Sequence, residues 1–416
     1  MYNPRMLLTS LSVAIAFLGQ SGVLCLDDSN LFHRLSNFAA HFARSPDAYS
    51  VISHGLGPND EGEDHKDLAA PAGSELRALN VGHGENTTVA VFQTKDIQAD
   101  NVTQAIIVIH GKMRDGDKYW QTFNKVVQKA RADYVHGSDG NIVVAAPTFF
   151  SKKYNYGQYA KDQLAWGDVN TWESGATAIH PKGTAATSID ALDALVDDFS
   201  DRSKYPRIAN ITVVGHGGGG QLAQRYAMLG ATPRSGVHVR YIHGDPSSCA
   251  YWTKDRPTSD TEKLPTAASC KLYNEWRYGF DKFPGTSDRT TDPQEFFRRY
   301  VTRDVISIIG YKDVATGNGD QFCMARIQGG RKRRDRNLTW YRYVNMLART
   351  NETLVGFPGK FENLPDWSHI SNGRTNMRLG IVKDAAHNAE KVFEGTIGQS
   401  ALFNDDDIEE GWRPKN

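Results

Sequence analysis

Four consecutive glycines in the middle of the chain are the feature that most constrains its fold. Gly217–Gly220 stand between an apolar run, Ile211–Val214, and a helical pattern, Leu222–Leu229. Glycines at such a junction let a strand and the following helix approach closely, because no Cβ atoms hold the two backbones apart. The segment therefore predicts a buried strand that turns sharply into a helix.

Short apolar runs and helical patterns alternate on both sides of this unit. The expected strands are Ala105–Ile109, Ile142–Ala146, Ile211–Val214, Val237–Ile242 and Val305–Ile309, after an opening hairpin of Leu76–Val81 and Thr88–Phe92. The expected helices are Tyr119–Ala132, Ser188–Phe199, which Ser188 is placed to cap, and Leu222–Leu229. This alternation indicates a mostly parallel sheet with helices on both faces. Functional residues of such sheets gather at the carboxyl ends of the strands.

The N-terminal part of the chain is expected to lie outside this domain. Residues 1–25 have a basic start, a short apolar stretch and small residues, which indicates a secretory signal peptide. Residues 26–75 predict an N-terminal helix followed by a polar linker, and residues 76–416 form the main domain. No later segment is apolar enough to span a bilayer.

An insertion at residues 245–300 breaks the alternation of strands and helices. It is rich in aromatic residues: Trp252, Tyr273, Trp276, Tyr278, Phe280 and Phe283. Two interpretations stay open, a cap over the functional site and aromatic packing within surface loops.

Two further features agree with a secreted, extracellular protein. The chain has five Asn-x-Ser/Thr sequons, at Asn86, Asn101, Asn210, Asn337 and Asn351, which are candidate glycosylation sites. We also expect one disulfide among Cys249, Cys270 and Cys323, with the pairing left open.

Charge and motif patterns argue against several function classes. Lysine plus arginine number 48 and aspartate plus glutamate also 48, so no bulk field favours nucleic acid. The basic run Arg331–Arg334 is interpreted as a solvated loop or a processing site. The glycine run lacks the Lys-Ser/Thr of a phosphate-binding loop, and no acidic residue follows as in a dinucleotide site. We therefore expect no cofactor and no metal, and the oligomeric state stays open.

The segment Gly215–Gln221 reads G-H-G-G-G-G-Q and is followed by Arg225-Tyr226-Ala227. It resembles the nucleophile elbow, G-x-S-x-G, of the α/β-hydrolase superfamily. It is most similar to secreted, mainly fungal hydrolase-like proteins that carry G-H-S-A-G-G-Q and then R-Y-A. Gly217 stands where these proteins have the catalytic serine. The resemblance covers roughly residues 76–403 and implies an α/β-hydrolase fold.

The resemblance also implies the other parts of a hydrolase site. Asp313, in the G-x-x-D segment after the strand Val305–Ile309, is the candidate acid, with Asp320 and Asp245 as alternatives. His387 is the candidate base, with His369 as its competitor. The backbone N–H groups of Gly218 and of the turn Gly111-Lys112 are the candidate oxyanion hole.

Without the serine, the covalent route of acyl transfer is closed. The sequence therefore favours a pseudoenzyme, or a strongly impaired hydrolase, that binds a small ester-like or hydrophobic ligand. The alternatives are an active carboxylic ester hydrolase and a non-hydrolytic acid–base catalyst, a lyase or cyclase, that uses His387. Ser248 or Cys249 would be a remote substitute nucleophile.

Overall fold

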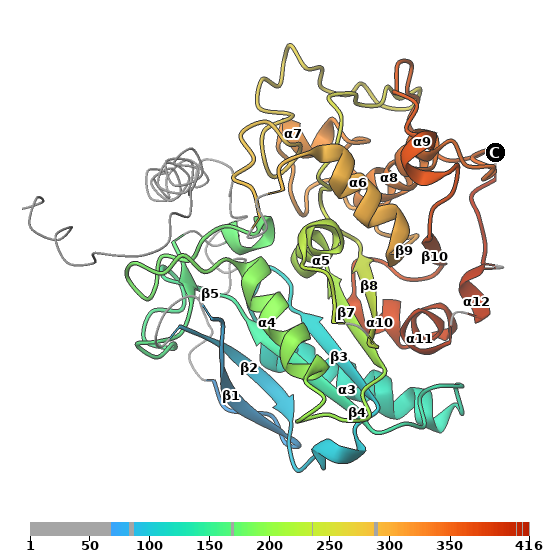
Figure 1. Cartoon of the computed structure of the whole chain (residues 1–416). Helices are drawn as coiled ribbons and strands as arrows, with labels where there is room; N and C mark the ends of the chain where they lie inside the picture. Colours follow the sequence, from blue (N-terminus) through green and yellow to red (C-terminus); the bar gives the residue numbers. More distant parts are fainter. Residues whose placement is uncertain are drawn as a thin grey trace, which may run out of the picture. The chain divides into compact units, whose positions relative to one another are not determined.

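A mixed sheet of eight strands forms the centre of the fold (Figure 1). In spatial order it comprises β1 (Ser74–Asn80), β2 (Thr88–Thr94), β4 (Ile142–Thr148), β3 (Gln104–Ile109), β7 (Asn210–His216), β8 (His238–Gly244), β9 (Asp304–Gly310) and β10 (Met377–Val382). β2 runs antiparallel to both of its neighbours, and the strands from β4 to β10 pair in parallel. The expected parallel sheet is thereby confirmed.

The computed structural model describes residues 68–415 apart from 83–86, 168–169, 235, 287–289, 405 and 410. The chain divides into two compact units, Met1–Ser45 and Pro46–Asn416, and the first lies outside the described residues. The expected signal peptide at residues 1–25 and the expected N-terminal helix also lie outside them, as does the sequon at Asn86.

Helices cover both faces of the sheet, because alternate residues of each strand point to opposite sides. On β3, Ile106 and Val108 belong to one buried cluster, whereas Ile107 and Ile109 belong to the other. The first face is covered by α3 (Gly116–Ala132), α10 (Ala389–Phe393), α11 (Thr396–Phe403) and α12 (Asp406–Glu409). The second is covered by α4 (Ser188–Ser200), α5 (Gly218–Leu229), α6 (Pro293–Thr302), α8 (Arg333–Ala348) and α9 (Ser368–Ser371).

Short elements complete the described chain. They are η2 (Ala99–Asn101), β5 (Phe150–Ser151), β6 (Ala165–Trp166), η3 (Thr171–Ser174) and α7 (Cys323–Arg326). The strands and helices predicted for the main domain are all found, each within a few residues of its predicted bounds, whereas β10, α6 and α8 were not predicted. The cap of α4 was misplaced by one residue, because Thr187 and Asp190 form the capping box.

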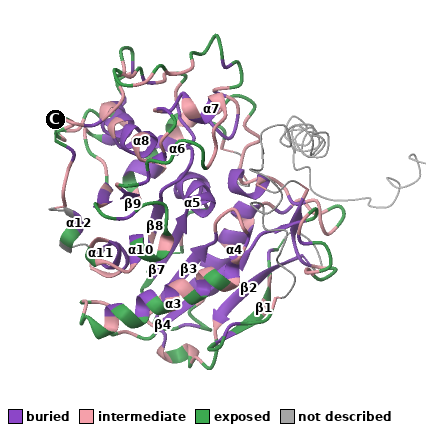
Figure 2. Ribbon diagram, turned by 180° about the vertical axis from the view of Figure 1, so that it is seen from behind, coloured by how far each residue is buried: buried purple, intermediate pink, exposed green. Residues whose placement is uncertain are grey.

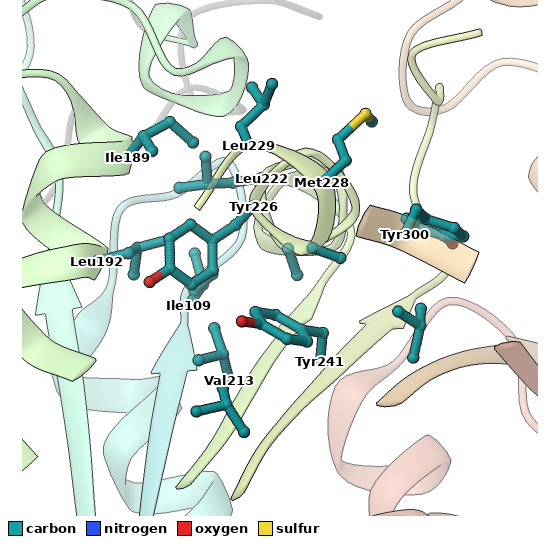
Figure 3. Close-up of a cluster of buried hydrophobic side chains, with 14 of the residues drawn as sticks. Ile109, Ile189, Leu192, Val213, Leu222, Tyr226, Met228, Leu229, Tyr241 and Tyr300 are labelled. Atoms are coloured by element: carbon teal, nitrogen blue, oxygen red, sulfur yellow. The ribbon is translucent and has the colours of Figure 1, made fainter. Parts of the chain in front are cut away.

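Helix α5 is buried along its whole length (Figure 2). Leu222 and Tyr226 of this helix pack with Val213 of β7 and Leu192 of α4 (Figure 3). The hydroxyl of Tyr226 donates a 2.8 Å hydrogen bond to Asp193. A helix without a solvent-exposed face is held on all sides, so its N-terminus is fixed relative to the sheet.

The insertion at residues 245–300 packs most of its aromatic side chains into the interior. Trp252 stacks on Tyr343, with ring centroids 5.9 Å apart, and also contacts Trp340. Trp276 packs against Phe283, and its indole N–H donates to the carbonyl oxygen of Ser174. Aromatic packing therefore accounts for these residues.

A disulfide joins the insertion to the segment that follows β9. Cys270 and Cys323 are bonded, with their Cα atoms 5.7 Å apart, and Cys249 is a buried free cysteine. The expected single disulfide is present, and the structure supplies the pairing that the sequence left open.

Two interpretations of the segment around residue 335 need correction. The basic run Arg331–Arg334 is a solvated loop only in part: Arg331 is exposed, but Arg333 is buried at the start of α8 and pairs with Asp313. Asn337 is not an accessible sequon, because its side chain is 1% exposed and its amide donates to the carbonyl oxygens of Pro246 and Arg333. Among the described helices, none has the length and apolarity needed to cross a bilayer.

The packing of α5 leads to a stability prediction. Leu222 is fully buried, so Leu222→Ala should lower the free energy of unfolding by about 2–5 kcal/mol through lost contacts and a cavity. Val355 is 60% exposed, so Val355→Ala should change it by less than about 0.5 kcal/mol. Urea unfolding of both variants measures the difference. Equal losses would contradict the central position of α5.

Candidate active site

The turn between β7 and α5 is the segment that the resemblance implies to be a nucleophile elbow. Gly217 has φ 60° and ψ −113°, a combination that residues other than glycine adopt only under strain. Its amide donates a 2.9 Å hydrogen bond to the carbonyl oxygen of Gly244, which ties the turn to the end of β8. The sequence expectation for this turn agrees with the geometry, and Gly217 is its tip.

The glycines beside the tip are required by close backbone contacts. A Cβ on Gly215 would lie 2.1 Å from the carbonyl oxygen of Gly219. A Cβ on Gly219 would lie 2.2 Å from the carbonyl oxygen of Ile109, and one on Gly220 would lie 2.3 Å from that of Gly244. Any side chain at these positions would push α5 away from the sheet.

His387 faces the tip of the elbow. It lies in the loop between β10 and α10, and a Cβ on Gly217 would be 3.0 Å from its Nε2 atom. Its Nδ1 atom lies 3.0 Å from Oδ2 of Asp313, which follows β9. Asp313 is buried, whereas the His387 side chain is 33% exposed. The base and the acid expected from the resemblance are thus brought together at Gly217.

Asp313 is shared with a second partner. Nε and Nη2 of Arg333 donate two 2.8 Å hydrogen bonds to the two carboxylate oxygens of Asp313. Burial alone would raise the pKa of Asp313, but the bonds from His387 and Arg333 lower it to about 2. The guanidinium therefore offsets the carboxylate charge that would otherwise stabilise a protonated His387.

The surroundings of His387 favour the neutral form of its imidazole. Its removal from water lowers its pKa, the nearby His216 lowers it further, and the bond to Asp313 opposes both effects. The rings of His216 and His387 are tilted with centroids 4.5 Å apart. A neutral imidazole of this kind can accept a proton or a metal ion at Nε2.

The candidate oxyanion hole lies beside the tip. Gly218 is the first residue of α5, and a Cβ on it would be 3.2 Å from the amide nitrogen of Lys112. The same Cβ would be 2.5 Å from Oε1 of Glu173. A carboxylate beside Gly218 adds negative charge where a hydrolase stabilises an oxyanion. Gly111 and Lys112 line the same pocket.

A pocket of about 730 Å³ opens in front of the elbow. Its charged side chains are Lys112, Asp115, Glu173, Asp320, Arg277 and Arg333. Glu173 accepts a hydrogen bond from Gln221 and pairs with Arg277. Arg277 in turn lies 3.6 Å from Asp320. One part of the pocket wall is therefore a network of paired charges, and Met113, Tyr119, Phe322 and Ala389 add apolar surface beside it.

The alternative site residues are placed as follows. Asp320 lines the pocket and accepts a hydrogen bond from Tyr278, and it is not a partner of His387. Asp245 follows β8, has φ 42° and pairs with His216. His369 is exposed on α9 and is not among the residues that line the pocket.

Neither substitute nucleophile is available to the pocket. The hydroxyl of Ser248 is buried and donates to Gln221. Cys249 is buried, and burial raises the pKa of its thiol to about 12. The thiolate, which is the nucleophilic form, is therefore scarce at neutral pH.

Sequence reasoning missed four residues of this site: His216, Glu173, Arg277 and Arg333. His216 occupies the variable position of the elbow motif directly before the tip, so its position was a usable signal. The other three gave no local signal, because their partners lie far away in the chain.

No family model matches this sequence, and no curated protein matches it either. Solved structures do resemble the fold. Poly(aspartic acid) hydrolase-1 from Sphingomonas sp. KT-1 has a TM-score of 0.50 and 16% identity, covering 80% of this chain and 98% of its own. The protein thus has the α/β-hydrolase fold.

Two more solved structures are less similar. The poly(3-hydroxybutyrate) depolymerase LpqC from Bordetella parapertussis has a TM-score of 0.47 and 16% identity, covering 77% of this chain and 87% of its own. The siderophore hydrolase EstB from Aspergillus nidulans has a TM-score of 0.39 and 13% identity, covering 85% and 100%.

The environment of His387 leads to a pH prediction. Its folded-state pKa should lie below the ordinary value of about 6.5. As the pH falls, the unfolded chain then takes up the proton first. The contribution of His387 to the free energy of unfolding is therefore complete above pH 6.5 and is lost as the pH falls toward the folded-state pKa. NMR titration of labelled histidine measures it. Asp313→Asn removes the hydrogen bond that raises the pKa of His387, so this variant should have a still lower pKa. A His387 pKa above 6.5 in the parent protein would contradict the geometry.

Proposed function

We propose that this protein is a secreted pseudoenzyme of the α/β-hydrolase fold that binds a small, polar, ester-like ligand. One observation carries the proposal: the elbow, the His387–Asp313 pair and a pocket occur together, but the tip facing Nε2 of His387 is Gly217. Without a hydroxyl there, no acyl-enzyme can form at the elbow. Loss of a triad member typically leaves about 10³–10⁴-fold catalysis over water.

The charged part of the pocket wall supports a ligand with polar groups. Paired charges such as Glu173 with Arg277 can exchange their mutual contacts for contacts to a ligand. The crowding of Glu173 against Gly218 also disfavours a developing oxyanion. Both features favour binding over ester hydrolysis.

A second candidate function is acid–base catalysis without a nucleophile. It is favoured by the neutral Nε2 atom of His387, which faces the pocket and is oriented by Asp313. A lyase or cyclase reaction needs a base of this kind and no serine.

Secretion is proposed from the N-terminal sequence and is supported by the disulfide. The bond between Cys270 and Cys323 is of the kind that persists in oxidising compartments. Asn210 and Asn351 are exposed sequons, so glycans there would not disturb the fold.

Gly217→Ser should create a reactive nucleophile. The serine Oγ would face Nε2 of His387, so a fluorophosphonate probe should label the variant and leave the parent unlabelled. The strained backbone should cost about 1–3 kcal/mol of stability. Labelling is measured by mass spectrometry of the intact chain.

Gly217→Ala is the matched control, because it adds the same Cβ without the hydroxyl and should stay unlabelled. Adding His387→Ala to the serine variant should abolish labelling. Labelling of the parent protein would rule out the pseudoenzyme, and an unlabelled but folded serine variant would show that the pair is not positioned for catalysis.

Glycopeptide mapping tests secretion and the burial of Asn337 together. The protein secreted from eukaryotic cells should carry glycans on one or more of the exposed sequons, such as Asn210 and Asn351, and none on Asn337. A glycan at Asn337 would contradict the packing of α8, and a protein retained in the cytosol would contradict secretion.

A further inference from the structure

Three potential metal ligands meet directly behind the tip of the elbow. One imidazole nitrogen each of His216 and His387 and one carboxylate oxygen of Asp245 lie within 4.8 Å of one another. His216 ends β7, Asp245 follows β8 and His387 follows β10, so the carboxyl ends of the strands bring them together. Neither the elbow motif nor the acid–base pair accounts for this grouping.

The carboxylate of Asp245 is the most unusual member. It is fully buried, and both of its oxygens accept hydrogen bonds from the backbone amide of Gly310, at 3.0 and 3.2 Å. Its ion-pair partner among the described residues is His216, at 3.2 Å, and no lysine or arginine is paired with it. A buried carboxylate is costly unless a cation neutralises it.

We propose that His216, Asp245 and His387 bind one divalent transition-metal ion, with Zn²⁺ as the first choice. Two imidazoles and one carboxylate suit zinc, whereas calcium and magnesium prefer oxygen ligands throughout. This proposal is independent of the proposed pseudoenzyme function, because it requires no substrate and no nucleophile.

The distances fit with small adjustments. Metal–ligand bonds of about 2.0–2.1 Å in a tetrahedron separate neighbouring ligand atoms by about 3.3 Å. Nε2 of His216 and Oδ2 of Asp245 are already 3.2 Å apart, so an ion would replace the proton between them. His387 has to approach by at most about 1.5 Å, because its ligand nitrogen lies within 4.8 Å of the other two ligand atoms.

The surroundings of His387 match those of a zinc-binding histidine. Its Nδ1 atom is held by the carboxylate of Asp313, which leaves Nε2 for a metal. A carboxylate in this position orients a ligating histidine and makes it more basic toward the ion. Arg333 fixes Asp313 in turn by two hydrogen bonds.

The glycine at the tip is also consistent with an ion. A side chain on Gly217 would start 3.0 Å from Nε2 of His387 and would compete for the same space. His216 and His387 both line the pocket, so the fourth coordination position would open into it. An ion there would bind a carbonyl or carboxylate oxygen of the pocket's ligand.

The test uses the full secreted chain without a histidine tag, stripped with a chelator and then titrated with ZnCl₂ by calorimetry. One Zn²⁺ should bind per chain, and Co²⁺ should give visible absorption bands typical of tetrahedral coordination. Asp245→Asn retains an acceptor for the amide of Gly310 but loses the charge. It and His387→Asn should each weaken Zn²⁺ binding at least about 10-fold.

Asp320→Asn and His369→Asn are the matched controls. The first removes a carboxylate from the same pocket and the second an exposed histidine, and both should leave the affinity unchanged. Circular dichroism verifies that each variant is folded. No stoichiometric binding by the parent, or binding that survives His387→Asn, would overturn the proposal without affecting the fluorophosphonate result for Gly217→Ser.

Discussion

The site depends on the contact between α5 and the strands β3, β7 and β8, which exists because three residues have no side chain. Gly215, Gly219 and Gly220 place backbone against backbone at distances where a Cβ would lie 2.1–2.3 Å from a carbonyl oxygen. This approach aims the N-terminus of α5, and with it the amide of Gly218, at the pocket. The buried side chains of α5, Leu222 among them, then lock the helix in place. The backbone of this turn therefore depends on its glycines and does not depend on a nucleophilic side chain.

A single carboxylate then sets the character of the acid–base pair. Asp313 accepts hydrogen bonds from both His387 and Arg333, so its negative charge interacts with a guanidinium as well as with the imidazole. In a working triad the acid's charge stabilises the imidazolium that forms when serine loses its proton. Here Arg333 lies against the same carboxylate and lowers the pKa of His387. The pair thus presents a neutral imidazole whose Nε2 atom can accept a proton, a hydrogen bond or a metal ion.

Local patterns in the sequence were sufficient for most of the sheet, but not for β10, α6 or α8. Apolar runs and helical spacing predicted β3, β4, β7, β8 and β9 together with the elbow, because strand burial and close turns leave their signal within a few neighbouring residues. The position of His387 followed from resemblance alone. Arg333 was misjudged, since a basic run resembles a solvent-exposed surface unless its partner, here 20 positions away, is known. The grouping of His216 with Asp245 could not be predicted either, because it depends on the register of β7 against β8.

The two proposals, a nucleophile position without its serine and a zinc site beside it, are physically connected. In a serine hydrolase the hydroxyl occupies the space in front of the histidine, and the acid–base pair serves it. With Gly217 at the tip, Nε2 of His387 faces that space directly, next to His216 and the buried charge of Asp245. The same strand ends that position a nucleophile, a base and an acid can equally position three ligands around a cation. Under both proposals, the glycine at the tip is the one difference that moves this scaffold from covalent catalysis toward binding chemistry, while the sheet, α5 and the pocket keep their arrangement.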